Sequence, residues 1–260
     1  MTVWDAVLLG FIQGATEFLP VSSSGHLVMA QAVLALDVPG VIFEVAVHVA
    51  TLLSIVLVYR GRLVQLARGV FEGDRDAYRY LGLLLVATLP AALLGVVGKD
   101  TIEALFDNPY VPGVALLVTG TFLWSGRTAL PRASVTRPGW GAALVIGVAQ
   151  AFALVPGISR SGATVVAALW LGLEAREAAA FSFLMAIPVI AGAAVLQAPE
   201  VVSGAALSPV VLLGGGLVAA VTGVLAIRTF VAVLGRRAFH LFAPYCWVIG
   251  VSFLLYLSLR

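Results

Sequence analysis

The stretch from residue 13 to 28, QGATEFLPVSSSGHLV, places a carboxylate, three serines and a histidine in an otherwise apolar part of the chain. A hydroxyl activated by a nearby base can attack phosphorus, and a histidine can move the proton or protonate the leaving oxygen. Ser23 and His26 stand three positions apart, a spacing that puts two side chains on neighbouring parts of one helical face. With Glu17 close by, the stretch indicates catalytic chemistry.

A second polar interruption, PGISRSG at residues 156–162, carries Arg160. A full positive charge inside a membrane is costly unless it meets a negative partner, and a phosphate or diphosphate would supply one. Glu17 then has three roles open to it. It could pair with Arg160 structurally, ligate a divalent cation such as Mg²⁺ or Ca²⁺ with Gln13 as an auxiliary ligand, or act as a base.

Composition indicates that these residues lie in a membrane protein. Of 260 residues, 61% are hydrophobic and 11% charged, and the mean hydropathy is +1.07. A spanning helix needs about 20 predominantly apolar residues. We therefore predict an all-α polytopic integral membrane protein, with residues 1–260 forming one membrane domain and no removable signal peptide. The six predicted spans are residues 43–59, 80–98, 111–128, 181–197, 209–228 and 241–258.

The distribution of arginines predicts the topology. Cytoplasmic loops of membrane proteins collect Lys and Arg, and the arginines cluster at residues 60–79, 127–137, 176 and 228–237. The connections at residues 37–42, 99–110 and 198–208 hold one lysine and mainly acidic residues, including Asp37 and Glu200. Both chain ends are therefore predicted to face outward. The partners expected are the bilayer and a lipid rather than nucleic acid, and a homo-oligomer is compatible with the pattern.

Two pairs of apolar segments are too short or too polar to cross alone: residues 3–19 with 25–36, and residues 139–155 with 162–173. Each pair is predicted to form a re-entrant hairpin of two half-helices. A shift of 137 residues aligns the two breaks, so that the chain reads as two repeats, approximately 1–128 and 139–260. Because three spans separate the hairpins, the repeats have inverted topology and their breaks meet near mid-membrane.

Each break precedes a half-helix whose first amide groups favour an anion. Ser24 and Ser161 are the predicted N-caps, and the glycines after them are expected to let a ligand approach the backbone. Glu44 and His48, four apart, are expected either to line the cavity or to form a buried hydrogen-bonded pair. Cys246 is expected to be a packing residue and His240 to be interfacial. The predicted substrate-binding residues are Gln13, Ser22, Ser24, Gly25, Ser159, Ser161 and Gly162.

The motifs QGATEFLPVSSSGH and PGISRSGAT resemble those of the undecaprenyl-pyrophosphate phosphatase family, also called bacitracin-resistance proteins. The resemblance extends over the order of spans. It implies an integral-membrane enzyme that removes the terminal phosphate of a C55 polyprenyl diphosphate, recycling the lipid carrier of cell-wall polymers. The topology predicted above adds that the first hairpin opens outward, so that the diphosphate enters from the outer leaflet of the cytoplasmic membrane.

Carried over by residue, the resemblance places the paired acidic motif of the family on Gln13 and Glu17, its serine on Ser23, its histidine on His26 and its arginine on Arg160. The chain departs at one position, because many members have glutamate where Gln13 stands. A glutamine carbonyl can ligate a hard cation but brings no charge.

Two other classes of function remain open. Inverted repeats with broken helices and a midplane anion site are also the signature of secondary transporters, so a transporter or flippase of a phosphorylated lipid or solute is the main alternative. A non-catalytic lipid-binding scaffold would explain the apolar composition. Neither alternative needs a nucleophile beside a histidine.

Overall fold

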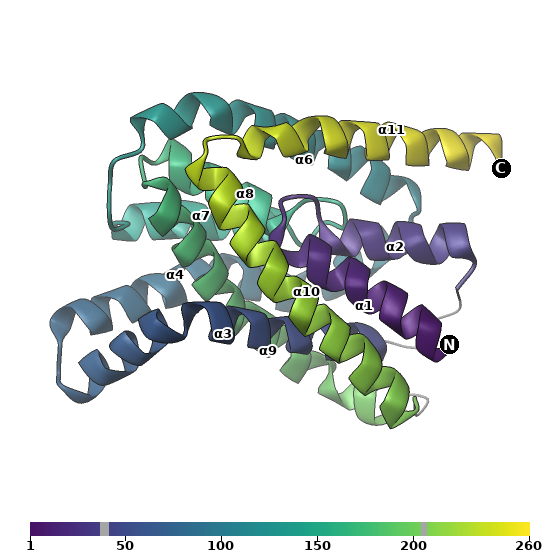
Figure 1. The fold of residues 1–260 in the computed structure, drawn as a ribbon, viewed down its shortest axis with the longest axis horizontal. Helices are drawn as coiled ribbons and strands as arrows, with labels where there is room; N and C mark the ends of the chain where they lie inside the picture. Colours follow the sequence, from purple (N-terminus) through teal and green to yellow (C-terminus); the bar gives the residue numbers. More distant parts are fainter. Residues whose placement is uncertain (37–41, 204–206) are drawn as a thin grey trace.

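The computed structural model describes residues 1–36, 42–203 and 207–260 (Figure 1). In these ranges the regular structure is helical, and one isolated bridge joins Val135 to Leu173. Five described helices are long and apolar enough to cross a membrane, which supports a polytopic membrane protein. Their ranges are Ile42–Phe71 (α3), Arg75–Val97 (α4), Ala175–Pro199 within α9 (Ala175–Ser203), Pro209–Gly235 (α10) and Phe239–Leu259, which joins the short helix η2 (Phe239–Leu241) to α11 (Phe242–Leu259).

The remaining predicted span is α6 (Tyr110–Ala129), a helix of 20 residues that is not among those five. Several predicted connections also contain helix, because long helices extend past the predicted spans and α5 lies between two of them. α3 continues past the end of its predicted span to Phe71, with non-helical dihedral angles at Tyr59, because the polar residues that end the apolar run are still good helix formers. The connection at residues 99–110 contains α5 (Lys99–Asp107). Asp37 lies outside the described residues.

Each predicted hairpin is two short helices separated by a break (Figure 1). The first is α1 (Val3–Phe18) and α2 (Ser23–Leu34), and the second is α7 (Trp140–Phe152) and α8 (Arg160–Trp170). The longest of the four has 16 residues, fewer than the roughly 20 that a spanning helix needs. A short 3-10 turn, η1 (Leu130–Arg132), precedes the second hairpin.

The two hairpins pack reciprocally. α1 lies along α10, and the corresponding helix α7 lies along α4. Glycines allow both approaches: a side chain at Gly10 would meet the backbone of Gly215 in α10, and one at Gly147 would meet the backbone of Ala87 in α4. Gly10 and Gly147 are related by the same shift of 137 residues that aligns the breaks. Small residues at helix contacts are typical of membrane proteins, where backbones must approach closely.

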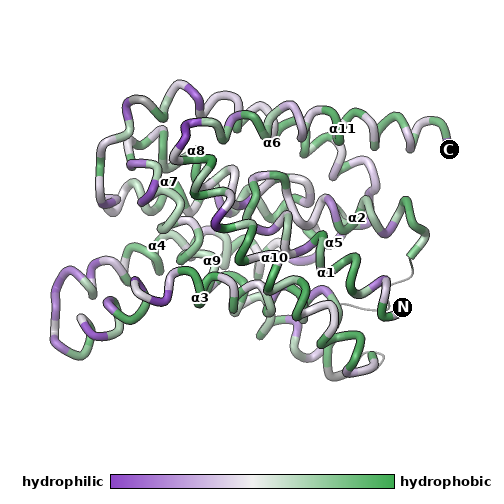
Figure 2. The backbone as a smooth tube through the Cα atoms, viewed as in Figure 1, coloured by the Kyte–Doolittle hydropathy of each residue, from purple (hydrophilic) through white to green (hydrophobic). Residues whose placement is uncertain are grey.

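The outer surface of the helices is apolar. Figure 2 shows hydrophobic residues along most of the helices, with hydrophilic residues at the turn between α3 and α4 and at other helix ends. Large apolar side chains such as Leu93, Val97 and Leu213 are at least two-thirds exposed. A soluble protein would not leave so much apolar surface in water, so this surface is suited to lipid.

We expect Gly10→Ala to destabilise the protein, whereas Gly61→Ala should leave its stability unchanged or slightly raised. The added methyl at residue 10 would meet Gly215 backbone atoms that cannot move independently, at a cost of about 1–3 kcal/mol. Gly61 lies within α3 and has no neighbour near the added methyl, so it reports helix propensity alone. Thermal unfolding of the purified protein in detergent measures both, and equal midpoints would contradict the close α1–α10 contact.

Candidate active site

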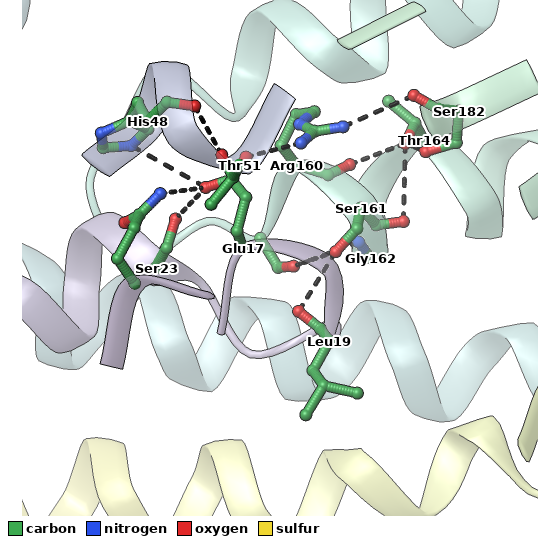
Figure 3. A network of polar contacts seen from close by, with 12 residues as sticks. Glu17, Leu19, Ser23, His48, Thr51, Arg160, Ser161, Gly162, Thr164 and Ser182 are labelled. Atoms are coloured by element: carbon green, nitrogen blue, oxygen red, sulfur yellow. Dashed lines mark hydrogen bonds and ion pairs between the residues drawn. The ribbon is translucent and has the colours of Figure 1, made fainter. Parts of the chain in front are cut away.

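The buried carboxylate of Glu17, in the last turn of α1, is the centre of a polar cluster (Figure 3). Its Oε2 accepts hydrogen bonds from the Ser23 hydroxyl at 2.6 Å and from the Gln13 amide at 3.0 Å. Its Oε1 accepts from Arg160 at 2.6 Å, forming an ion pair. The structure thus brings together four predicted site residues from α1, α2 and α8.

Local helix geometry explains how these groups converge. Gln13 and Glu17 are four apart in α1 and so share one face. Ser23 is the first residue of α2, and Arg160 is the first residue of α8. The two positions correspond under the shift of 137 residues. Each half-helix therefore presents one functional side chain at its positive end, where an anion is favoured.

The helix caps lie two residues earlier than predicted. The hydroxyl of Ser22 accepts from the amide of Gly25 at 3.3 Å, and that of Ser159 accepts from the amide of Gly162 at 3.1 Å. A capping side chain bonds the third helical amide, so a helix beginning at Ser23 or Arg160 must be capped by the residue before it. The prediction was wrong for Ser24 and Ser161, which lie 3.3 and 3.2 Å from the capping hydroxyls.

The glycine of the first break allows a close backbone contact. A side chain at Gly25 would lie 2.9 Å from Cα of Gly157, so the missing side chain lets the backbone of the second break approach. Gly157 has φ +98°, which favours glycine. Thr119 of α6 donates to the Gly157 carbonyl at 2.8 Å and accepts from the Ser159 amide at 3.0 Å. Nothing in the pattern around Thr119 identified this contact.

Both ring nitrogens of His26 have partners other than Ser23. Its Nδ1 lies 2.8 Å from the Ser22 carbonyl, and its Nε2 lies 2.8 Å from the Tyr245 hydroxyl of α11. The two rings stack with centroids 5.7 Å apart. Because a carbonyl only accepts, Nδ1 carries a proton, and a neutral ring accepts from Tyr245 through Nε2. His26 therefore links the first break to α11.

The predicted pair Glu44 and His48 borders the same site. His48 Nε2 is 3.8 Å from Glu17 Oε2, and its Nδ1 is 2.7 Å from the Glu44 carbonyl. The Glu44 carboxylate accepts instead from Gln31 at 3.0 Å. Both residues line the cavity described below, which agrees with the first of the two predicted alternatives for this pair.

Arg160 is held from the other side by residues that the sequence did not single out. Its Nη1 donates to the Ser182 carbonyl of α9 at 3.4 Å. Thr164, one turn further along α8, donates to the Arg160 carbonyl at 2.7 Å, and its hydroxyl lies 2.6 Å from that of Ser182. The four-residue spacing of Arg160 and Thr164, which places both on one helical face, is the sequence feature from which this contact could have been predicted. Elsewhere, Cys246 is fully buried, as expected of a packing residue.

A cavity of about 300 Å³ opens beside the Glu17 cluster, at the small end of the range for ligand sites. One end is polar, and the remaining wall is mainly apolar, from α2, α3, α4, α5, α9 and the residues that follow α7. Gln150, which corresponds to Gln13, also lines it. The predicted residues that line the polar end are Glu17, Ser22, Ser23, Ser24, Ser159 and Arg160. Such a cavity fits a ligand with an anionic head and an apolar chain.

Comparisons with known proteins find a matching family and relatives that are similar over nearly their whole length. The family model for bacitracin resistance protein BacA matches residues 6–252. The chain belongs to this family. It is 42% identical to the undecaprenyl-diphosphatase of Desulforapulum autotrophicum, over 96% of this chain and 97% of that protein. It is 36% identical to the protein of the same name from Alkaliphilus metalliredigens, over 98% and 99%.

We expect Tyr245→Phe to lower kcat about two- to tenfold with little change in KM. The substitution removes the hydroxyl that holds His26, and one hydrogen bond contributes roughly 0.5–1.5 kcal/mol. The break that carries Ser23 would then be less well positioned while the cavity keeps its shape. Tyr110→Phe, at an exposed tyrosine at the start of α6, is the control. Unchanged kcat in Tyr245→Phe would contradict a positioning role, and so would an equal loss in the control.

Proposed function

We propose that this chain hydrolyses undecaprenyl diphosphate to the monophosphate and inorganic phosphate. The relatives that it matches carry the name undecaprenyl-diphosphatase. The observation that carries the proposal is the Glu17 carboxylate, which binds the hydroxyl of Ser23 through one oxygen and the guanidinium of Arg160 through the other. A nucleophile, a base and a cation thus meet at one cavity. A transporter would need the cation and the helix ends but not the activated hydroxyl.

In the proposed mechanism, Ser23 Oγ attacks the terminal phosphorus in line while Glu17 Oε2 accepts its proton. The bond from this phosphorus to the bridging oxygen breaks, and undecaprenyl phosphate leaves. Water then hydrolyses the phosphoserine and releases inorganic phosphate. Arg160 and the first amides of the half-helices stabilise the charge on the transferred oxygens, which is the main catalytic contribution in phosphoryl transfer.

The structure favours Glu17 over His26 as the base. Ser23 already donates to Glu17 at 2.6 Å, within the range for proton transfer. His26 is engaged by the Ser22 carbonyl and by Tyr245. We therefore assign to His26 the positioning of the first break rather than the proton transfer that its spacing from Ser23 indicated.

We further propose that a divalent cation, Mg²⁺ or Ca²⁺, binds with the diphosphate. Among the described residues no three acidic, histidine or cysteine side chains form a cluster. Gln13 nevertheless leaves its buried Oε1 without a hydrogen bond, next to Glu17. A hard cation fits such oxygens when substrate phosphates supply the other ligands. Glu17 and Gln13 would hold the cation, which would offset part of the diphosphate charge.

The proposed setting is the cytoplasmic membrane, with six spans including α6 and two hairpins that enter from opposite faces as inverted repeats. The arginine distribution and the reciprocal packing of α1 on α10 and α7 on α4 support it. On this topology both termini face outward and the diphosphate enters from the outer leaflet. The tail stays in lipid, because each buried CH₂ is worth about 0.8 kcal/mol.

We expect Ser23→Ala and Arg160→Lys each to reduce phosphate release from undecaprenyl diphosphate on the order of 100- to 1,000-fold. Alanine removes the nucleophile, and lysine keeps the charge but loses the planar fork that pairs with two phosphate oxygens. Ser258→Ala and Arg228→Lys, both at exposed positions, are matched controls that should retain full activity. Near-normal turnover by Ser23→Ala would eliminate the phosphoserine and leave Glu17 activating water.

We expect chelation of divalent cations to abolish phosphate release by the wild type, and added Mg²⁺ or Ca²⁺ to restore it. Gln13→Glu should bind Mg²⁺ more tightly, because a second carboxylate adds charge to the site. Isothermal titration calorimetry of Mg²⁺ binding to the purified protein measures this affinity without turnover. Full activity in excess chelator would remove the cation from the mechanism.

A further inference from the structure

The short helix α5 forms part of the cavity wall, although none of its residues is buried. Ile102 and Phe106 are four apart, share one face and line the cavity. Phe106 is 37% exposed. The acidic side chains Asp100, Glu103 and Asp107 are exposed. α5 is therefore amphipathic, and its apolar face borders the cavity rather than the protein core.

α9 continues the apolar wall with Val189, Ile190 and Ala193, which also line the cavity. The same cavity holds Glu17 and Arg160 at its polar end. Its lining therefore combines an anion site with an apolar wall. A free phosphate would leave the apolar wall without a contact. A lipid without a diphosphate would leave the anion site unused.

We propose that Ile102 and Phe106 of α5 bind the isoprene units nearest the diphosphate, and so select polyprenyl diphosphates over diphosphates without a prenyl chain. This inference rests on the proposed function. The apolar face of α5 lines the cavity while its acidic residues are exposed, so the helix offers the cavity a surface that hydrocarbon can contact. The first isoprene units must lie between the anion site and the bilayer. Contact with α5 removes their apolar surface from water.

The test compares two substrates with the full-length protein in detergent micelles: undecaprenyl diphosphate and methyl diphosphate, which has the head but no prenyl chain. Phe106→Ala should raise KM for undecaprenyl diphosphate about tenfold, which corresponds to about 1.4 kcal/mol. Its kcat for that substrate, and its kcat/KM for methyl diphosphate, should stay at the wild-type values. Phe106→Leu, which keeps an apolar side chain, should stay within about twofold of the wild type.

Phe71→Ala is the matched control, since Phe71 is 90% exposed at the far end of α3 and does not line the cavity. Ile102→Ala should shift KM in the same direction as Phe106→Ala. An unchanged KM in both α5 variants would overturn the inference, and so would an equal loss on both substrates. A wild type that released no phosphate from undecaprenyl diphosphate would overturn the proposed function instead.

Discussion

The structure depends on neutralising one buried carboxylate. Glu17 is only 7% exposed within an apolar protein, and a charge in such a place is tolerated only when it is paired and hydrogen-bonded. Its partner Arg160 lies 143 residues away in the chain and in the other hairpin. The pair therefore holds the two breaks together. It also places a hydroxyl and a guanidinium where a diphosphate would bind.

The reciprocal packing of the hairpins makes this meeting possible. Each hairpin lies against a long helix of the other half of the chain, α1 on α10 and α7 on α4. Gly25 and Gly157 let the breaks touch through their backbones. The two half-helices then point their positive ends at one cavity, each with a different side chain at its first position. Corresponding positions thus supply the hydroxyl of Ser23 and the guanidinium of Arg160 to the same carboxylate.

Much of this arrangement follows from local sequence. The apolar runs and their breaks predicted the hairpins, and the cost of a charge in a membrane predicted that Arg160 meets an anion. Contacts that tertiary packing decides could not be predicted. The spacing of Ser23 and His26 puts both on one helical face, but the partner of His26 Nε2 is the hydroxyl of Tyr245, which is 219 residues away. α5 lies within a predicted connection, because the acidic residues of this segment interrupt its apolar pattern.

The central claim is that the Glu17 carboxylate activates Ser23 and orients Arg160. The most direct measurement is phosphate release from undecaprenyl diphosphate by purified Glu17→Gln, which keeps the size of the side chain and removes its charge. The account predicts a loss of turnover on the order of 100-fold or more, as expected when a catalytic base is removed. Turnover within a few fold of the wild type, in a protein that remains folded, would contradict it.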